Sequence, residues 1–382
     1  MKGQDRKLQA IVEAKLDKIV SDFSFVERGN TLYRGYPAVY GDAAAETFEL
    51  VQKSGGLSRE QLLERKPHWH EDFRVVIARD LEEHNYIFAT EIVRNLARHT
   101  SKGKPVIWVT PVGPMGHYPI IAEIMNKLRN SLLFRPELIF PFAMDEWSDE
   151  NGNVVKDPQF TSYVTGFAED MQEQFYRRLT NQAKIPEENL RYAAGEGLEE
   201  YVPAMENILE QETGVVFTGG VGMTGHIMFW EPTYGALLGK ELSEKVMYIR
   251  GAPLTSETIA QNRFTSAASA PVPPSANTIG LGLFCMIREC EEKNPGKVNA
   301  VFGLDNVEEP LIWQRFIAQS MLAMTQTDPS FSATYPATLP GAYIVVENHL
   351  KGFRVPSKQS PRNRKDADIW WYEGCLENGR ES

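Results

Sequence analysis

Short runs of β-branched and aromatic residues alternate with amphipathic segments along most of the chain from residue 74 onward. These runs predict strands at 74–78, 105–110, 137–144, 215–218, 246–250, 276–282, 298–304 and 342–347. Helices are predicted at 80–99, where Asp80 and Glu83 have capping-box spacing, after residue 117 with Pro119 in the first turn, and near 164–182 and 197–212. Strands alternating with helices indicate an α/β fold, a mostly parallel, doubly wound sheet with helices on both faces.

The same pattern divides the chain into three regions. Residues 1–71 begin with apolar residues at helical spacing from Leu8 to Val20 and then lose regular periodicity, which predicts an N-terminal helical extension. Residues 72–350 contain the α/β domain. Residues 351–382 are polar until Trp370, and we expect a C-terminal arm that docks through its Trp-Trp-Tyr run at 370–372.

Composition and charge narrow the classes of partner. The chain has 51 acidic and 40 basic residues among 382, a formal net charge of -11, which argues against nucleic acid or an anionic membrane as the main partner. No apolar stretch is long enough to span a membrane, and the charged N-terminus does not resemble a secretory signal. Three cysteines without a C-x-x-C pair fit a reducing compartment. We therefore expect a cytoplasmic protein.

One glycine-rich loop, "GGVGMTGHIMFWEP" at 219–232, follows the strand at 215–218 and contains a G-x-G-x-x-G pattern. A dinucleotide site needs a helix that opens at the third glycine, but Pro232 lies too close to Gly225 for a long uninterrupted helix from there. No cofactor is therefore predicted. A histidine among glycines, His226, followed by Glu231, instead favours proton transfer by an imidazole that a carboxylate orients; a histidine satisfied in a tight turn is the alternative.

Two further loops come at strand ends, where parallel sheets gather their chemistry. In the loop at 144–148, Asp145 and Glu146 follow an apolar strand, so partial desolvation would make a carboxylate there a usable general base. A helix cap or a solvated pair is the alternative for these acids. The loop at 110–117, which contains Gly113, leads into a helix N-terminus that can hold an anion. The pair His68 and His70 lacks a third ligand nearby, and no metal site is predicted.

Several motifs in order resemble the glucosamine-6-phosphate deaminase/isomerase family. Its superfamily includes ribose-5-phosphate isomerase, 6-phosphogluconolactonase and CoA transferases. "MDEW" at 144–147 is similar to the family's "MDEY", and 220–232 to "GxGxDGHIAFNEP". "SYVTGF" at 162–167, "LTSETIAQNRF" at 254–264 and "VPPSANTIGLGLF" at 272–284 match further family motifs. Together they span about residues 74 to 350.

The resemblance implies a modified doubly wound fold, a homo-oligomer, and an aldose–ketose isomerisation coupled to loss of ammonia from a sugar or sugar phosphate. By motif position, Asp145 would be the base that moves the proton between C2 and C1, His226 would assist ring opening, and Glu231 would hold and tune His226. Arg263 falls where the family's lid arginine meets the phosphate. The remaining substrate-binding positions implied are Gly113, Glu146, Gly220, Gly222, Thr224 and Gly225.

Four departures from the family concern the same sites. Thr224 stands where the family has an aspartate, and Trp230 where it has an asparagine. The phosphate loop "PTGGTP" is "TPVGPMG" here, and the lysine of "GxxKA" has no counterpart in 303–316, where Asp305, Glu308 and Glu309 lie instead. The phosphate site is therefore predicted to be altered. Lactone hydrolysis with the histidine as base, and sugar binding without turnover, are the alternative functions.

Overall fold

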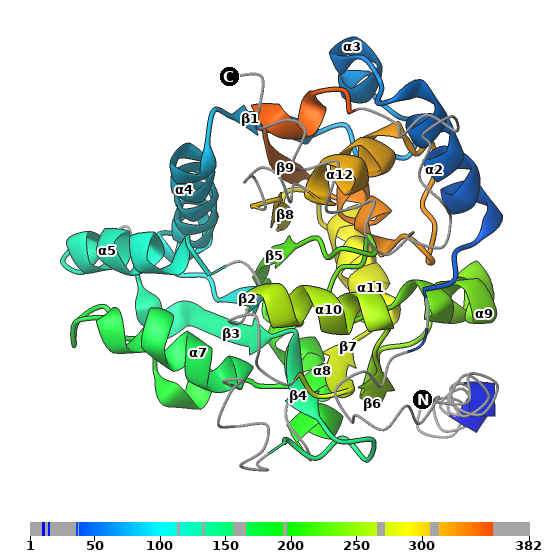
Figure 1. Ribbon diagram of the computed structural model, residues 1–382. Coiled ribbons are helices and arrows are strands. Elements are labelled where there is room, and N and C mark those ends of the chain that lie inside the picture. Colours follow the sequence, from blue (N-terminus) through cyan, green and yellow to red (C-terminus); the bar gives the residue numbers. More distant parts are fainter. Residues whose placement is uncertain are drawn as a thin grey trace.

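The computed structural model of the chain describes residues 10–11, 14–15, 36, 38–112, 115–131, 134–155, 166–193, 197–265, 272–305 and 313–353. At its centre are six parallel strands in the order β1-β9-β8-β5-β2-β3 (Figure 1). They are β1 (Phe73–Ala78), β2 (Val106–Thr110), β3 (Ile139–Ala143), β5 (Gly214–Gly220), β8 (Val298–Gly303) and β9 (Gly341–Val346). The predicted α/β fold with a mostly parallel sheet is confirmed.

A second sheet contains β4 (Asp145–Ser148), β7 (Ser275–Ile279) and β6 (Tyr248–Pro253), all antiparallel to their neighbours. The sequence predicts β6 and β7 as strands but treats 144–148 as a loop, and that expectation is wrong. The tetrapeptide of β4 shows no hydrophobic alternation, because all four of its residues are buried. Asp145 pairs with Thr278 in the register of this sheet.

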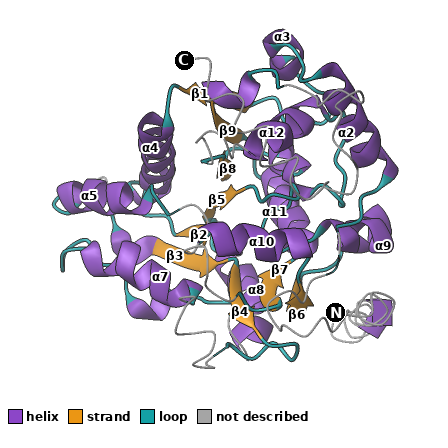
Figure 2. Ribbon diagram, in the orientation of Figure 1, coloured by secondary structure: helices purple, strands orange, loops and turns teal. Residues whose placement is uncertain are grey.

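Helices cover both faces of the large sheet (Figure 2). On one face lie α4 (Leu81–Thr100), α5 (Tyr118–Leu128) and α7 (Phe167–Gln174), and on the other α8 (Gly197–Leu209), α11 (Leu281–Lys293) and α12 (Trp313–Ala323). Strand alternation explains the two cores: Val215 and Phe217 of β5 pack on the α11 side, whereas Val216 packs on the α4 side. The other helices are α9 (Pro232–Ser243) and α10 (Ser256–Thr265).

The predicted helix starts agree with the observed caps. Asp80 is the N-cap of α4, and its carboxylate accepts a hydrogen bond from the Glu83 amide at 2.8 Å. Pro119 occupies the first turn of α5. The helix predicted near 164–182 is α7 followed by a 3-10 turn at Tyr176–Arg178. Further 3-10 turns lie at Pro136–Leu138, Glu187–Asn189, Ser332–Thr334, Pro336–Thr338 and Glu347–Leu350.

The described part of the predicted N-terminal extension packs directly on the α/β core. Its helices α2 (Asp42–Ser54) and α3 (Arg59–Leu63) lie against α12, and Tyr36 and Leu62 are buried in the same cluster as β5. Most of the helix expected between Leu8 and Val20, and the arm beyond residue 353 with its aromatic run at 370–372, lie outside the described residues. None of the helices that the structure describes is both long and apolar enough to cross a membrane.

Candidate active site

A cavity of about 230 Å³ lies at the carboxyl ends of the central strands. Its wall takes residues from the segments that follow β2, β3, β5 and β8, and from α10, which crosses this end of the sheet (Figure 1). The lining residues are Pro111, Val112, Met144, Asp145, Phe167, Gly220, Val221, Gly222, His226, Met228, Phe229, Gln261, Asn262, Thr265, Asp305 and Gln314. The strand-end segments singled out in the sequence therefore meet at one place, as expected for an α/β sheet.

Asp145 is the first residue of β4 and is 6% exposed. Burial raises the pKa of its carboxyl well above the usual range, and the neighbouring Glu146 carboxylate raises it further. Among the described residues, none donates a hydrogen bond to this carboxylate. A desolvated carboxylate with a raised pKa that faces a cavity is a stronger base than one in water, as a proton-abstracting group requires.

The loop that holds His226 depends on close contacts that only glycine permits. A Cβ atom at Gly222 would lie 2.2 Å from the His226 imidazole, so the ring occupies the space that any other side chain would fill. Gly225 has a φ of +74° and its carbonyl accepts a hydrogen bond from the Ala333 amide. Gly222 also donates its amide to the His226 carbonyl at 2.9 Å. The glycines thus fix the direction of the imidazole.

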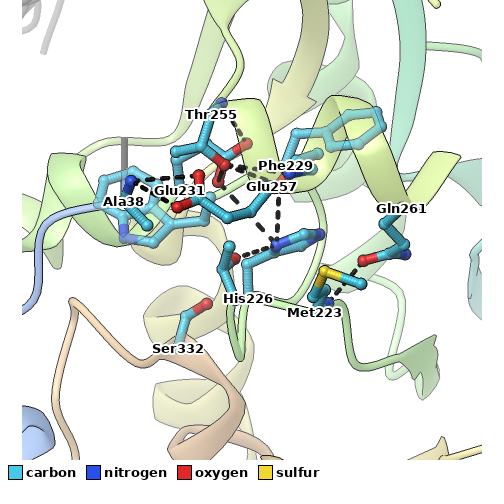
Figure 3. A network of polar contacts seen from close by, with 12 residues as sticks. Ala38, Met223, His226, Phe229, Glu231, Thr255, Glu257, Gln261 and Ser332 are labelled. Carbon is cyan, nitrogen blue, oxygen red and sulfur yellow. Dashed lines mark hydrogen bonds and ion pairs between the residues drawn. The ribbon is translucent and has the colours of Figure 1, made fainter. Parts of the chain in front are cut away.

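Hydroxyl groups surround the inner nitrogen of His226. Its Nδ1 lies 2.6 Å from the Thr224 Oγ1 and 3.4 Å from the Thr258 Oγ1, and 4.0 Å from the Glu231 Oε2 (Figure 3). Burial lowers the pKa of His226 to about 4, so the imidazole is neutral at pH 7. With Nδ1 held by these partners, Nε2 is the nitrogen left for the cavity.

Glu231 is fully buried behind the histidine, at the N-cap of α9. Its carboxylate accepts hydrogen bonds from the Thr255 amide at 3.0 Å and the Thr255 Oγ1 at 3.1 Å. Burial raises its pKa to about 7, although the hydrogen bonds from Thr255 and Thr258 oppose that rise. Beside its direct contact with His226, Glu231 is connected to the imidazole through hydroxyls, because the Thr255 Oγ1 also lies 3.0 Å from the Thr258 Oγ1, which is 3.4 Å from Nδ1.

The comparisons with known proteins agree with this site. No family model matches the chain. A glucosamine-6-phosphate deaminase from Phocaeicola vulgatus is 27% identical over 227 residues, covering 56% of this chain and 75% of the relative. One from Borreliella afzelii is 26% identical over 216 residues, covering 55% and 71%. Over about half of its length, the chain is therefore similar in sequence to glucosamine-6-phosphate deaminases, at 26–27% identity.

A solved structure is similar to this chain in fold. A monomeric glucosamine-6-phosphate deaminase superposes with a TM-score of 0.50 at 16% identity, covering 72% of this chain and 99% of that one. The sequence motifs shared with the deaminases include the two segments that bring Asp145 and His226 to the cavity. At the position where the deaminase motif has an aspartate, Thr224 offers the imidazole a neutral hydroxyl instead of a carboxylate.

Glu146, predicted from the deaminase motif to bind substrate, does not line the cavity. Its carboxylate accepts backbone hydrogen bonds from Phe167 and Ala168 in the first turn of α7, and from Trp147, each at 2.9 Å. Neighbouring residues of a strand point to opposite faces, so Asp145 and Glu146 cannot both face the cavity. In this structure Glu146 holds the N-terminus of a helix, the alternative role that the sequence had left open.

Of the other predicted residues, some line the cavity and others do not. Gly220 and Gly222 line the cavity, whereas Thr224 and Gly225 lie behind it and support His226. Arg263 is half-buried on α10 and is not among the lining residues. Gly113 lies outside the described residues.

Sequence reasoning missed four polar lining residues: Gln261, Asn262 and Thr265 on α10, and Gln314 on α12. Gln261 and Asn262 fall inside the segment 254–264, in which the similarity to the family's lid predicted only Arg263 as a binding residue. Gln314 gave no signal of its own in the sequence.

Neither of the two cofactor patterns weighed in the sequence matches the observed geometry. The helix after the G-x-G-x-x-G pattern begins at Pro232, beyond Gly225, so no helix N-terminus faces the glycines as a dinucleotide requires. Within the described ranges no three histidine, cysteine or acidic side chains lie close enough together to hold a metal ion.

Proposed function

We propose that the protein is a sugar isomerase and deaminase that acts on an amino sugar, with Asp145 as the base. One observation supports this above the others. Asp145 and His226, from segments 81 residues apart in the chain, line the same cavity, one as a buried carboxylate and the other as an oriented neutral imidazole. A base beside a proton-shuttling histidine suits a reaction that opens a sugar ring and then moves a proton between carbons.

In the proposed reaction the open-chain 2-amino aldose loses its C2 proton to Asp145. The electrons of the C–H bond form the C1–C2 double bond, and the C1 oxygen takes a proton from a water molecule, which gives an enolamine. The protonated Asp145 then returns its proton to C1, and C2 becomes an imine. Water adds to that imine and ammonia leaves, which yields the 2-ketose. The raised pKa of Asp145 favours both its acceptance of the proton and its brief retention.

His226 is proposed to move the proton between the anomeric hydroxyl and the ring oxygen when the ring opens. Its low pKa, about 4, keeps it neutral at pH 7, so one nitrogen can accept a proton. Glu231, whose pKa is raised to about 7, lies 4.0 Å from Nδ1 and would stabilise the imidazolium while it exists. The Gly220 and Gly222 segment and Asn262 are proposed to contact the sugar.

The test compares Asp145→Asn with the wild-type chain, using glucosamine and glucosamine 6-phosphate as substrates. We expect ammonia release to fall by at least about 10³-fold, because the amide cannot accept a proton, while sugar affinity changes by less than about tenfold. Glu137→Gln, an exposed site in the β2–β3 connection, makes the same charge change and should keep full activity. Wild-type turnover in the Asn variant would refute the assignment.

The altered histidine network favours a second candidate, sugar binding without turnover. Thr224 gives Nδ1 a neutral partner, so on that side of the ring the described carboxylate that can stabilise the imidazolium is Glu231, 4.0 Å away. Thermal stabilisation by a sugar without ammonia release would support this candidate. Lactone hydrolysis, with His226 activating water, predicts no exchange at a sugar carbon. Incorporation of solvent deuterium at C1 of the product would exclude both.

A further inference from the structure

A second acidic group faces the cavity, from the strand next to that of the glycine loop. Asp305 follows the end of β8 and lines the wall. Behind this strand end lies His84, fully buried in the first turn of α4. A Cβ atom at Gly303 would come within 2.8 Å of the His84 Nε2, so the imidazole packs directly against the strand end that leads to Asp305.

The two side chains interact, and His84 is fixed from its other side. Its Nδ1 lies 3.2 Å from the Asn85 Oδ1, and its Nε2 is buried beside the strand end. Burial raises the pKa of Asp305, and the nearby His84 opposes that rise. Burial lowers the pKa of His84, and the Asp305 carboxylate opposes that change. The mechanism proposed above uses neither residue.

The charges around the cavity do not suit a phosphate. Its ionisable lining residues are Asp145, Asp305 and the neutral His226, and the described wall contains no lysine or arginine. By sequence, the undescribed stretches between 113 and 312 contain one basic residue, Lys156. A phosphate dianion in such a cavity would meet two carboxylates in a poorly screened environment. A neutral hydroxyl or an ammonium group would meet favourable acceptors.

We propose that the site takes an amino sugar without a phosphate group, and that Asp305, supported by His84, determines this preference by accepting a hydrogen bond from a substrate hydroxyl. This inference rests on the proposed sugar site. The Asp305 carboxylate, when ionised, forms a short, charge-assisted hydrogen bond with a substrate hydroxyl, whereas a fully ionised phosphate at the same place has no proton to donate. The ammonium group of the sugar adds attraction from the same carboxylates.

The test measures binding to the full chain by calorimetry with glucosamine and galactosamine, each free and as its 6-phosphate. We expect the free sugars to bind at least about tenfold more tightly than their phosphates. Asp305→Asn should weaken free sugars about tenfold and reduce or reverse the preference, because it removes the anion that attracts the amine and repels phosphate. Glu137→Gln, with the same charge change at an exposed site, should behave as wild type.

The outcomes separate this inference from the proposed reaction. Tighter binding of both 6-phosphates to the wild-type chain, an unchanged preference in Asp305→Asn, or no binding of any of the four sugars would overturn it. Because binding is measured without turnover, the preference can hold even if ammonia is never released, and that result would refute only the reaction. Circular dichroism of Asp305→Asn confirms that a changed affinity reflects the site and not the fold.

Discussion

At the scale of single residues, Thr224 is the nearest side-chain partner of the His226 imidazole. Its uncharged hydroxyl lies 2.6 Å from the His226 Nδ1, and burial lowers the pKa of His226 to about 4. We expect Thr224→Asp to raise the pKa of His226 by at least about one unit, because a carboxylate within hydrogen-bond distance favours the imidazolium. NMR titration of the imidazole measures this shift.

The matched control is Thr224→Val, which keeps the shape of the side chain and removes the hydroxyl. Valine should leave the pKa of His226 low, since it adds no charge. Equal pKa values in the aspartate and valine variants would show that Glu231, 4.0 Å from Nδ1, already supplies the electrostatic environment of the ring.

The sequence predicted part of this site for a clear physical reason. Asp145, His226 and Glu231 follow apolar strands, and strand ends of a parallel sheet meet at one edge, so their convergence follows from the pattern. Which face of β4 each acid occupies does not, because Asp145 and Glu146 are adjacent carboxylates and only the register with β7 assigns one to the cavity. The sequence pattern likewise does not tell which of two adjacent residues of α10 faces the cavity, and in the structure Asn262 rather than Arg263 lines the wall.

At the scale of elements, Glu146 connects the three-stranded sheet to α7. It accepts three backbone hydrogen bonds, two of them from the first turn of α7, where the helix dipole also favours a negative charge. Glu146→Ala should lower the free energy of unfolding by about 2–3 kcal/mol, because buried amides lose their acceptor. Urea denaturation measures this loss.

A neighbouring position on the same helix provides the comparison. Glu169 is an exposed acid in the first turn of α7, and Glu169→Ala should change stability by less than about 0.5 kcal/mol. Similar losses in the two variants would mean that Glu146 acts only through the helix dipole and not through its hydrogen bonds.

The elements themselves were largely predictable, and the exceptions have a common cause. The six parallel strands show as apolar runs because both faces of their sheet are covered. The sequence pattern did not predict β4, because this strand is short and polar. Its pairing with β7 joins segments about 130 residues apart, and local periodicity does not encode such a contact.

At the scale of the whole molecule, residues 36–71 belong to the packing of the site although they lie outside the family resemblance. The Tyr40 hydroxyl donates to the Thr224 carbonyl at 3.1 Å, and the Val39 amide donates to the Thr233 Oγ1 at 3.1 Å. Tyr36 is buried against Pro253. Residue 71 therefore marks where the sequence similarity begins, and not where the packing of the molecule divides. The homo-oligomer remains a prediction.

Buried histidines also couple the stability of the molecule to pH. His117 is fully buried, stacks on Phe88 at 4.3 Å between ring centroids, and has no hydrogen-bond partner for either ring nitrogen among the described residues. Burial, together with a smaller contribution from the charge of His84, lowers its pKa to about 3. Because the unfolded chain binds this proton below about pH 6.5 and the folded chain does not, His117 stabilises the fold above that pH, and the stability is lost as pH falls toward 3.

The variant His117→Phe should remove this dependence. Between pH 7.5 and 5.0 we expect the free energy of unfolding to fall by about 2 kcal/mol more in the wild-type chain than in the variant. The reason is that over about 1.5 pH units, from about pH 6.5 to 5.0, His117 is protonated in the unfolded chain and neutral in the folded chain. Glu231, whose raised pKa has the opposite effect on stability in this range, is present in both chains and cancels in the difference. His117→Gln cannot titrate either, so its pH dependence should match that of His117→Phe, at lower overall stability. Parallel pH curves for all three chains would place the acid sensitivity at another group.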